Sequence, residues 1–103
     1  MKRVGYTYIL TNANNTTLYV GVTADLMKRM EEHINKKFPN SFSAKYNLTT
    51  LVWFEGFNHI EEAIAREKQL KAGSRKRKEE LINTINPKWE NLYLKIISGE
   101  IEV

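Results

Sequence analysis

The sequence predicts a single α+β domain, within the broad α/β class, built as a small three-stranded antiparallel β-sheet packed with helices. Two β-rich runs flank a short loop of asparagine residues, which is the pattern of a β-hairpin. Four later segments carry apolar residues at helical spacing, and a third β-rich run follows the first of them. The resulting order, β-β-α-β-α-α-α, favours a small sheet covered by helices.

The hairpin carries two tyrosines, Tyr8 in its first strand and Tyr19 in its second, and leads directly into a helix. This helix is predicted from about residue 24 to residue 36, with Thr23 as its N-cap. Pro39 follows the helix and opens a loop, because proline cannot donate the next backbone hydrogen bond.

The third strand is expected at residues 49–57, where both faces are apolar. A strand of this kind is predicted to lie in the middle of a sheet that is covered on both sides. Asn58 is expected to cap the next helix, which Gly73 ends. Ser74 is expected to cap another helix, and Pro87 to start a last short one.

The composition is that of one folded domain, with 42% hydrophobic residues in a chain of 103. We expect residues 1–97 to form this domain and residues 98–103 to be a frayed C-terminal tail. No stretch is long and apolar enough to cross a membrane, and the start of the chain lacks the apolar segment of a secretion signal. These features predict a cytoplasmic protein.

Cysteine is absent, which excludes disulfides, thiolate catalysis and Cys-ligated zinc. Two histidines, His33 and His59, do not make a His-rich site, whereas an oxygen-bound ion such as magnesium remains compatible. Sixteen Lys and Arg against twelve Asp and Glu give a formal net charge of +4, and the clustering of the positive charge suits a polyanion or, alternatively, a solvated helix surface. The candidate nucleic-acid-binding residues are Lys36, Lys37, Lys68, Lys71, Arg75, Lys76, Arg77 and Lys78.

Glu67 is the strongest single signal of chemistry, because apolar residues three or four positions away place it beside the buried stripe of its helix. A carboxylate in such a place is costly unless it is paired or bound to a metal ion. The alternative is an internal salt bridge with Arg29 or a lysine. The other candidates also have plain alternatives. The tyrosines could be buried side chains that only pack. Arg29 could form a surface ion pair with Asp25 or Glu32, and His33 could be a helix-face histidine without a role.

Together, these residues resemble the GIY-YIG nuclease family, most of all its small, free-standing, single-domain members. The resemblance covers the chain from about Tyr6 to Leu92. It rests on the order and spacing of Tyr8, Leu18-Tyr19-Val20-Gly21, Arg29, Glu67-Lys68-Gln69-Leu70-Lys71 and Asn86-Pro87-Lys88-Trp89-Glu90-Asn91-Leu92.

The resemblance implies a metal-dependent endonuclease, a phosphodiester hydrolase acting on DNA, with structure-selective activity linked to DNA repair or recombination. It implies that Tyr19 or Tyr8 helps to activate water and that Arg29 steadies the phosphate. Glu67 would hold one Mg²⁺ or Mn²⁺ ion. His33 matches a position that the family places near the scissile phosphate.

The later polar residue of the family corresponds to Asn86 or Asn91, and we assign it to Asn86. The chain departs from the family pattern at two places: the first motif lacks its leading glycine, and Val22 stands where some relatives carry a lysine. Neither departure removes a proposed ligand, but the missing lysine is expected to weaken catalysis.

Two other functions remain open, a non-catalytic nucleic-acid-binding module of the same fold and a protein-interaction domain that uses Trp53 and Trp89. Metal-dependent cleavage separates the first from a nuclease, and the second predicts no affinity for DNA. The nuclease hypothesis makes a structural prediction of its own. It places the five candidates of the two strands and two helices on one concave surface: Tyr8, Tyr19, Arg29, His33 and Glu67.

Overall fold

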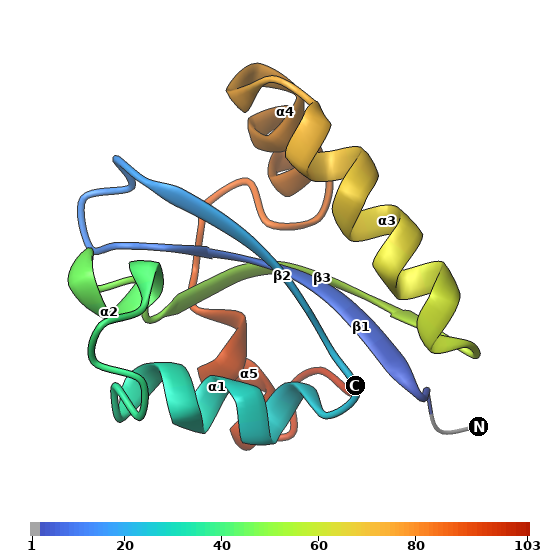
Figure 1. Ribbon diagram of the computed structural model, residues 1–103, viewed down its shortest axis with the longest axis horizontal. Coiled ribbons are helices and arrows are strands. Elements are labelled where there is room, and N and C mark those ends of the chain that lie inside the picture. Colours follow the sequence, from blue (N-terminus) through green and yellow to red (C-terminus); the bar gives the residue numbers. More distant parts are fainter. Residues whose placement is uncertain (1–2) are drawn as a thin grey trace.

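A computed structural model describes residues 3–103, and a three-stranded antiparallel sheet forms its centre (Figure 1). Its strands are β1 (Gly5–Thr11), β2 (Leu18–Thr23) and β3 (Thr50–Phe57), in the order β2-β1-β3. The predicted fold class is therefore confirmed. The prediction that the third strand lies in the middle of the sheet is wrong, since β1 occupies that position. Helices cover both faces of the sheet, so an edge strand such as β3 is buried from both sides as well.

The helices divide between the two faces of the sheet (Figure 1). Helices α1 (Leu26–Ile34) and α5 (Leu92–Ile97) supply residues to a core on one face. Helices α3 (Ile60–Ala72) and α4 (Arg75–Ile85) supply residues to a second core on the other face. A short helix, α2 (Phe42–Lys45), lies in the loop between α1 and β3.

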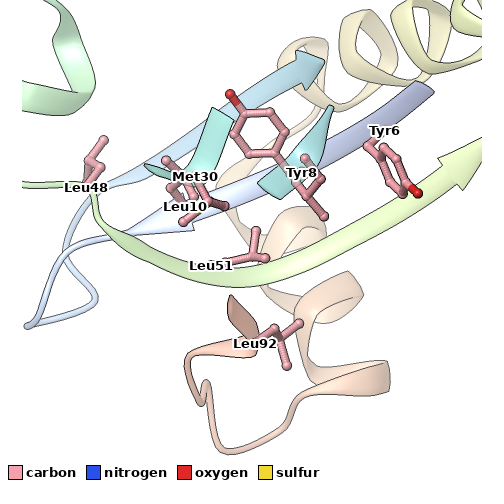
Figure 2. Packing of buried hydrophobic residues seen from close by; sticks show 8 residues of the cluster. Tyr6, Tyr8, Leu10, Met30, Leu48, Leu51 and Leu92 are labelled. Carbon is pink, nitrogen blue, oxygen red and sulfur yellow. The ribbon is translucent and has the colours of Figure 1, made fainter. Parts of the chain in front are cut away.

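The core on the α1 face is built around Tyr8, whose side chain is completely buried (Figure 2). Leu10 from β1, Met30 from α1 and Leu51 from β3 belong to the same cluster, as does Leu92 from α5. Alternate residues of β1 face the other side, where Ile9 packs in the second core. Because side chains alternate between the two faces of a strand, the central strand β1 contributes residues to both cores.

Local capping differs from the prediction at several helix starts. Asp25, not Thr23, caps α1, and its carboxylate accepts from the Lys28 backbone N–H at 3.2 Å. His59 is the N-cap of α3 and makes no side-chain capping bond, while Asn58 accepts a hydrogen bond from Arg3 instead.

The loop after Pro39 contains the unpredicted helix α2, whose first turn Ser41 caps through the Ala44 backbone N–H. Pro87 does not start the last helix. Asn91 is the N-cap of α5, and its side-chain oxygen accepts from the Tyr93 backbone N–H at 3.1 Å.

The end of α3 and the start of α4 follow the prediction. Gly73 is the C-cap of α3, and Ser74 caps α4 by accepting from the Arg77 backbone N–H at 3.2 Å.

The C-terminal segment, predicted to be a frayed tail, makes contacts with the rest of the fold. The backbone N–H groups of Glu100 and Ile101 donate to the Lys95 carbonyl at 2.9 and 3.3 Å, and the Ile101 side chain packs against the α1-face core. Apolar contact of this kind holds the chain as far as Ile101. Within residues 3–103, none of the helices combines the length and the apolar character that crossing a membrane requires.

Candidate active site

The Tyr8 ring lies over Gly21, its cross-strand neighbour on β2. A Cβ atom built on Gly21 would lie only 2.4 Å from both Cζ and the hydroxyl oxygen of Tyr8. Residues directly opposite each other in an antiparallel pair project to the same side of the sheet. Glycine at this position therefore makes room for the phenol, which explains physically why the two motifs occur together.

A chain of hydrogen bonds extends from the Tyr8 hydroxyl into α1 and α2. The hydroxyl is 2.9 Å from Nε2 of His33, and Nδ1 of the same ring is 2.9 Å from Oγ of Ser43. Ser43 Oγ in turn lies 3.3 Å from Oγ of Ser41. A neutral imidazole donates through one nitrogen and accepts through the other. If Tyr8 donates to His33, then His33 donates to Ser43, and in the other tautomer both hydrogen bonds are reversed.

Burial controls the protonation of this pair. It raises the pKa of Tyr8 to about 12, while the nearby Arg29 guanidinium opposes the shift. Burial also lowers the pKa of His33 to about 4, and Arg29 acts in the same direction. At neutral pH the phenol therefore keeps its proton and the imidazole carries no charge.

The buried state of His33 predicts a pH-dependent stability. Its pKa is lower in the fold than the ordinary value near 6.5, so on acidification the unfolded chain gains a proton that the folded chain does not. The free energy of unfolding should therefore fall by about 2–3 kcal/mol between pH 7 and pH 4.5.

Urea unfolding at the two pH values measures this contribution. His33→Gln should remove that part of the pH dependence, whereas His59→Gln, at the exposed start of α3, should keep it. An unchanged pH dependence in His33→Gln would assign the effect to other groups.

A cavity of about 320 Å³ opens beside this chain of hydrogen bonds. Tyr19 lines it, and the Tyr19 ring centroid lies 5.8 Å from that of His33 and 6.4 Å from that of Tyr8. Arg29 and Ser43 also line the cavity. Tyr8 is completely buried behind these residues, so Tyr19 is the phenol of the two that faces the open space.

Arg29 presents a guanidinium to the cavity that is already engaged on one side. Its Nη1 lies 3.1 Å from Oε1 of Glu32, and Lys37 reaches the other oxygen of the same carboxylate at 3.3 Å. Hydrogen bonding from Arg29 lowers the pKa of Glu32. The ion pair with Glu32, one of the two plain alternatives for Arg29, is therefore present. One third of the Arg29 side chain remains exposed, which leaves room for an anion to bind.

Glu67 approaches this region from the opposite face of the sheet. The preceding residue, Arg66, pairs with Glu55 of β3 at 3.1 Å, so Glu67, about 100° further round the helix, is turned toward the other edge, where β2 lies. Its carboxylate bonds Lys71 at 3.2 Å, and only 16% of its side chain is exposed. Its charge also contributes to the raised pKa of Tyr8.

That Glu67 shares one concave surface with Tyr8, Tyr19, Arg29 and His33 stays a prediction. The structure brings Tyr8, Tyr19, Arg29 and His33 together on the α1 face, while Glu67 reaches toward the β2 edge from the α3 face. The sheet is only three strands wide and β2 is one of its two edge strands, so groups from the two faces can meet around that edge.

Comparison with known proteins identifies the family of this fold and site. Residues 4–83 match the model of the GIY-YIG catalytic domain. The chain belongs to the GIY-YIG family. Members of this family act as nucleases, and the match therefore supports a nuclease domain.

Three relatives support this placement in the GIY-YIG family. A UPF0213 protein of Syntrophus aciditrophicus is 34% identical over 77 residues, which cover 75% of this chain and 87% of that protein. A UPF0213 protein of Clostridium perfringens is 36% identical over 92 residues, covering 85% and 92%. The solution NMR structure of the UPF0213 protein BH0048 from Bacillus halodurans is 30% identical, with a TM-score of 0.54 and coverage of 85% and 92%.

The GIY-YIG nucleases generally depend on a divalent metal ion, and the donor set of this chain fits a hard cation. No group of three or more His, Asp or Glu side chains gathers at one point in residues 3–103. Magnesium is often held by one or two carboxylates, with water and substrate phosphate completing its coordination. Glu67, whose carboxylate side chain is 16% exposed and whose charge contributes to the raised pKa of Tyr8, can supply that single protein ligand.

Asn86 does not reach the cavity of the GIY-YIG site. It is buried, and its amide donates to the carbonyls of Val52 and Glu90 at 3.0 and 2.9 Å while its oxygen accepts from the Glu90 N–H. Asn91 is also engaged with backbone, accepting from the Leu51 N–H at 3.3 Å. Both asparagines therefore hold the connection between α4 and α5 against β3, and the predicted site role of Asn86 stays a prediction.

Most of the predicted basic residues have partners in the described part of the chain, and three are exposed without one there. Arg75 is engaged within the fold: it donates to the carbonyls of Asn15 and Thr16 at 2.7 and 2.8 Å and pairs with Glu79 at 2.8 Å. It therefore docks α4 on the hairpin turn, which the sequence did not predict. Lys78 donates to the Gly73 carbonyl. Lys71 and Lys37 are ion-paired, and Lys36 lines the cavity. Lys68, Lys76 and Arg77 are exposed and make no side-chain hydrogen bond or ion pair within residues 3–103.

Lys76 and Arg77 are the pair of α4 cations with which to test a phosphate-binding surface, because both side chains are exposed. Replacing both by alanine should weaken DNA binding alike for all sequences and lower the salt slope by about 1–2. The slope comes from binding measured at several salt concentrations. Glu80→Ala, an exposed change on the same helix, is the control, and an unchanged slope in the double variant would place the phosphate contacts elsewhere.

Sequence reasoning missed Ser43, Ser41 and the helix α2 that carries Ser43. A usable signal was present, because serine is a favoured N-cap and Ser41 precedes Phe42-Ser43-Ala44. The hydrogen bond between Ser43 and His33 depends on tertiary packing and has no local signature in the sequence.

Proposed function

We propose that this GIY-YIG domain is a divalent-metal-dependent endonuclease that hydrolyses phosphodiester bonds in DNA. The observation that carries the proposal is the convergence of Tyr8, Tyr19, Arg29 and His33 around one cavity. A guanidinium that lines such a cavity can grip two oxygens of a phosphate. Structure-selective cleavage in repair or recombination is the activity that the proposal assigns to it.

The two phenols have different tasks in this proposal. Tyr8, buried and with a pKa of about 12, is a poor base and positions the neutral imidazole of His33 through their hydrogen bond. Tyr19 faces the cavity and orients the attacking water beside the phosphate. Arg29 stabilises the charge that develops on the phosphate oxygens, and the phosphate must displace part of its bond to Glu32.

Glu67 is the residue that would hold the divalent ion. Such an ion supplies Lewis-acid polarisation of the phosphate and lowers the pKa of bound water. Because Lys71 already pairs with Glu67, this lysine must release the carboxylate or stay beside it when a cation binds. The half-exposed Lys71 side chain can swing away at little cost.

The non-catalytic nucleic-acid-binding module is the second candidate, and the Arg29–Glu32 ion pair favours it, since a carboxylate beside the guanidinium opposes phosphate. The protein-interaction hypothesis has less support. Trp53 is 4% exposed in the core, and Trp89 packs against the same core with its indole N–H bonded to Asn83.

The experiment that tests the proposal is a cleavage assay on branched, nicked and plain duplex DNA, with magnesium or manganese and with chelator. Cleavage that requires the metal ion supports the nuclease. Binding of DNA without cleavage under every metal condition would favour the binding module instead.

A further inference from the structure

Three half-exposed aromatic rings gather in one loop beside the cavity. Phe38, Phe42 and Tyr46 are 50%, 49% and 50% exposed, and every other strongly exposed large apolar residue described by the structure is aliphatic. Residues 36–47, which hold these rings, are called the aromatic loop below. Exposed aromatic surface concentrated in one place marks a binding site more often than exposed residues scattered singly do.

The two ends of the aromatic loop are held together by a hydrogen bond. Lys36 and Asn47, its first and last residues, have φ values of 51° and 55°, and the Lys36 ammonium donates to the Asn47 side-chain oxygen. The Leu48 N–H donates to the Ser43 carbonyl at 2.8 Å, and the Leu48 side chain is completely buried. The rings are therefore presented on a loop that is held in place before any ligand arrives.

The rings lie next to the proposed catalytic groups. Phe42 stacks on Tyr19, with centroids 6.3 Å apart and planes 26° from parallel, and Tyr46 continues the row at 4.7 Å from Phe42. Phe38 lies beside Arg29, whose guanidinium carbon is 5.7 Å from the Phe38 ring centroid. Phe38 and Phe42 both line the cavity.

Positive charge accompanies this aromatic surface. Lys36 and Arg29 line the cavity, and the Lys37 ammonium lies 5.7 Å from the Phe38 ring centroid. Aromatic faces interleaved with cations are the combination that binds single-stranded nucleic acid, because bases stack on the rings while cations follow the phosphates. In a paired duplex the base faces are covered by neighbouring bases and are not presented.

We infer that the aromatic loop stacks unpaired bases of a DNA strand, so that the preferred substrate has single-stranded character next to the cleaved bond. The inference rests on the proposed nuclease function only for placing that bond at Arg29. Stacking itself depends on Phe38 and Phe42 and can be measured without cleavage.

The test is a binding comparison in chelator, using one fluorescent DNA single strand and the duplex of the same sequence. The wild-type protein should bind the single strand more tightly. Phe42→Ala and Phe38→Ala should each weaken single-strand binding by about 5- to 100-fold and leave duplex binding almost unchanged. Phe42→Tyr keeps a stacking face and should retain affinity, and Leu94→Ala, at a 60% exposed position on α5, is the matched control.

Equal losses for single strand and duplex, or no loss in either alanine variant, would overturn the inference. Thermal melting of each variant excludes unfolding as the cause, and Phe38→Ala provides an independent change if Phe42→Ala unfolds. The two proposals fail separately. Ring-dependent binding without cleavage of any DNA removes the nuclease and keeps the stacking surface, whereas metal-dependent cleavage with no role for the rings does the reverse.

Discussion

Replacing Glu67 by glutamine is expected to lower the rate of metal-dependent cleavage on the order of 100-fold or more, while DNA binding is retained. The substitution keeps the size of the side chain and its hydrogen-bonding capacity but removes the charge that holds a divalent ion. Since a bound cation supplies several kcal/mol of transition-state stabilisation, the loss should fall on the chemical step.

The stability of Glu67→Gln separates a metal ligand from half of an internal salt bridge. The partner of Glu67 is Lys71, and 53% of the Lys71 side chain is exposed. Loss of this surface pair should therefore cost less than about 0.5 kcal/mol, whereas stranding a buried cation would cost about 3–5 kcal/mol. Thermal melting with and without magnesium measures this cost. In wild type alone, magnesium should raise the melting temperature.

Glu62→Gln is the matched control for this variant, because it makes the same change at an exposed position of the same helix. It should cleave like wild type at equal DNA binding. Full cleavage by Glu67→Gln would remove Glu67 from the metal site.

Gly21→Ala is expected to displace the Tyr8 ring and to destabilise the fold by about 1–3 kcal/mol, the usual cost of overpacking a core. The new methyl group would lie 2.4 Å from Cζ and from the hydroxyl oxygen of Tyr8, and a buried ring has little room to retreat. Moving the ring also breaks its hydrogen bond to His33, so cleavage should fall together with stability. Urea unfolding and the cleavage assay report the two effects.

A double-mutant cycle identifies the clash as the cause. In a Tyr8→Leu background, where no ring lies over the glycine, Gly21→Ala should cost less than in wild type. Gly73→Ala is the control for a glycine change without a clash, since its Cβ would come no closer than 3.4 Å to another atom. Equal costs of Gly21→Ala in both backgrounds would show that contact with Tyr8 is not responsible.

Features that depend on neighbouring residues in the chain could be predicted from the sequence. The hairpin, the two later helices and their boundary at Gly73 and Ser74 follow from strand periodicity, helical spacing and capping. The residue types of the site, such as Tyr8 and Arg29, were also visible, because their order and spacing resemble those of the family.

Local signals competed where the prediction failed. Thr23 and Asp25 lie two residues apart and are both good N-cap residue types, and the side chain that accepts the Lys28 N–H is that of Asp25, not of the predicted Thr23. The tail was expected to fray because of its position at the end of the chain, and the contact of the apolar Ile101 with the core depends on packing that its position does not show.

The tertiary structure alone decided how the elements are placed around the site. Both faces of β3 are apolar whether it lies at the centre or at the edge, so sequence pattern could not order the strands as β2-β1-β3. The side of the sheet that α3 covers, and with it the approach of Glu67 from the β2 edge, depends on packing between residues far apart in the chain. The sequence by itself determined which chemical groups are available, whereas long-range packing determined that His33 joins Tyr8 to Ser43, because no local pattern encodes the contacts between separate elements.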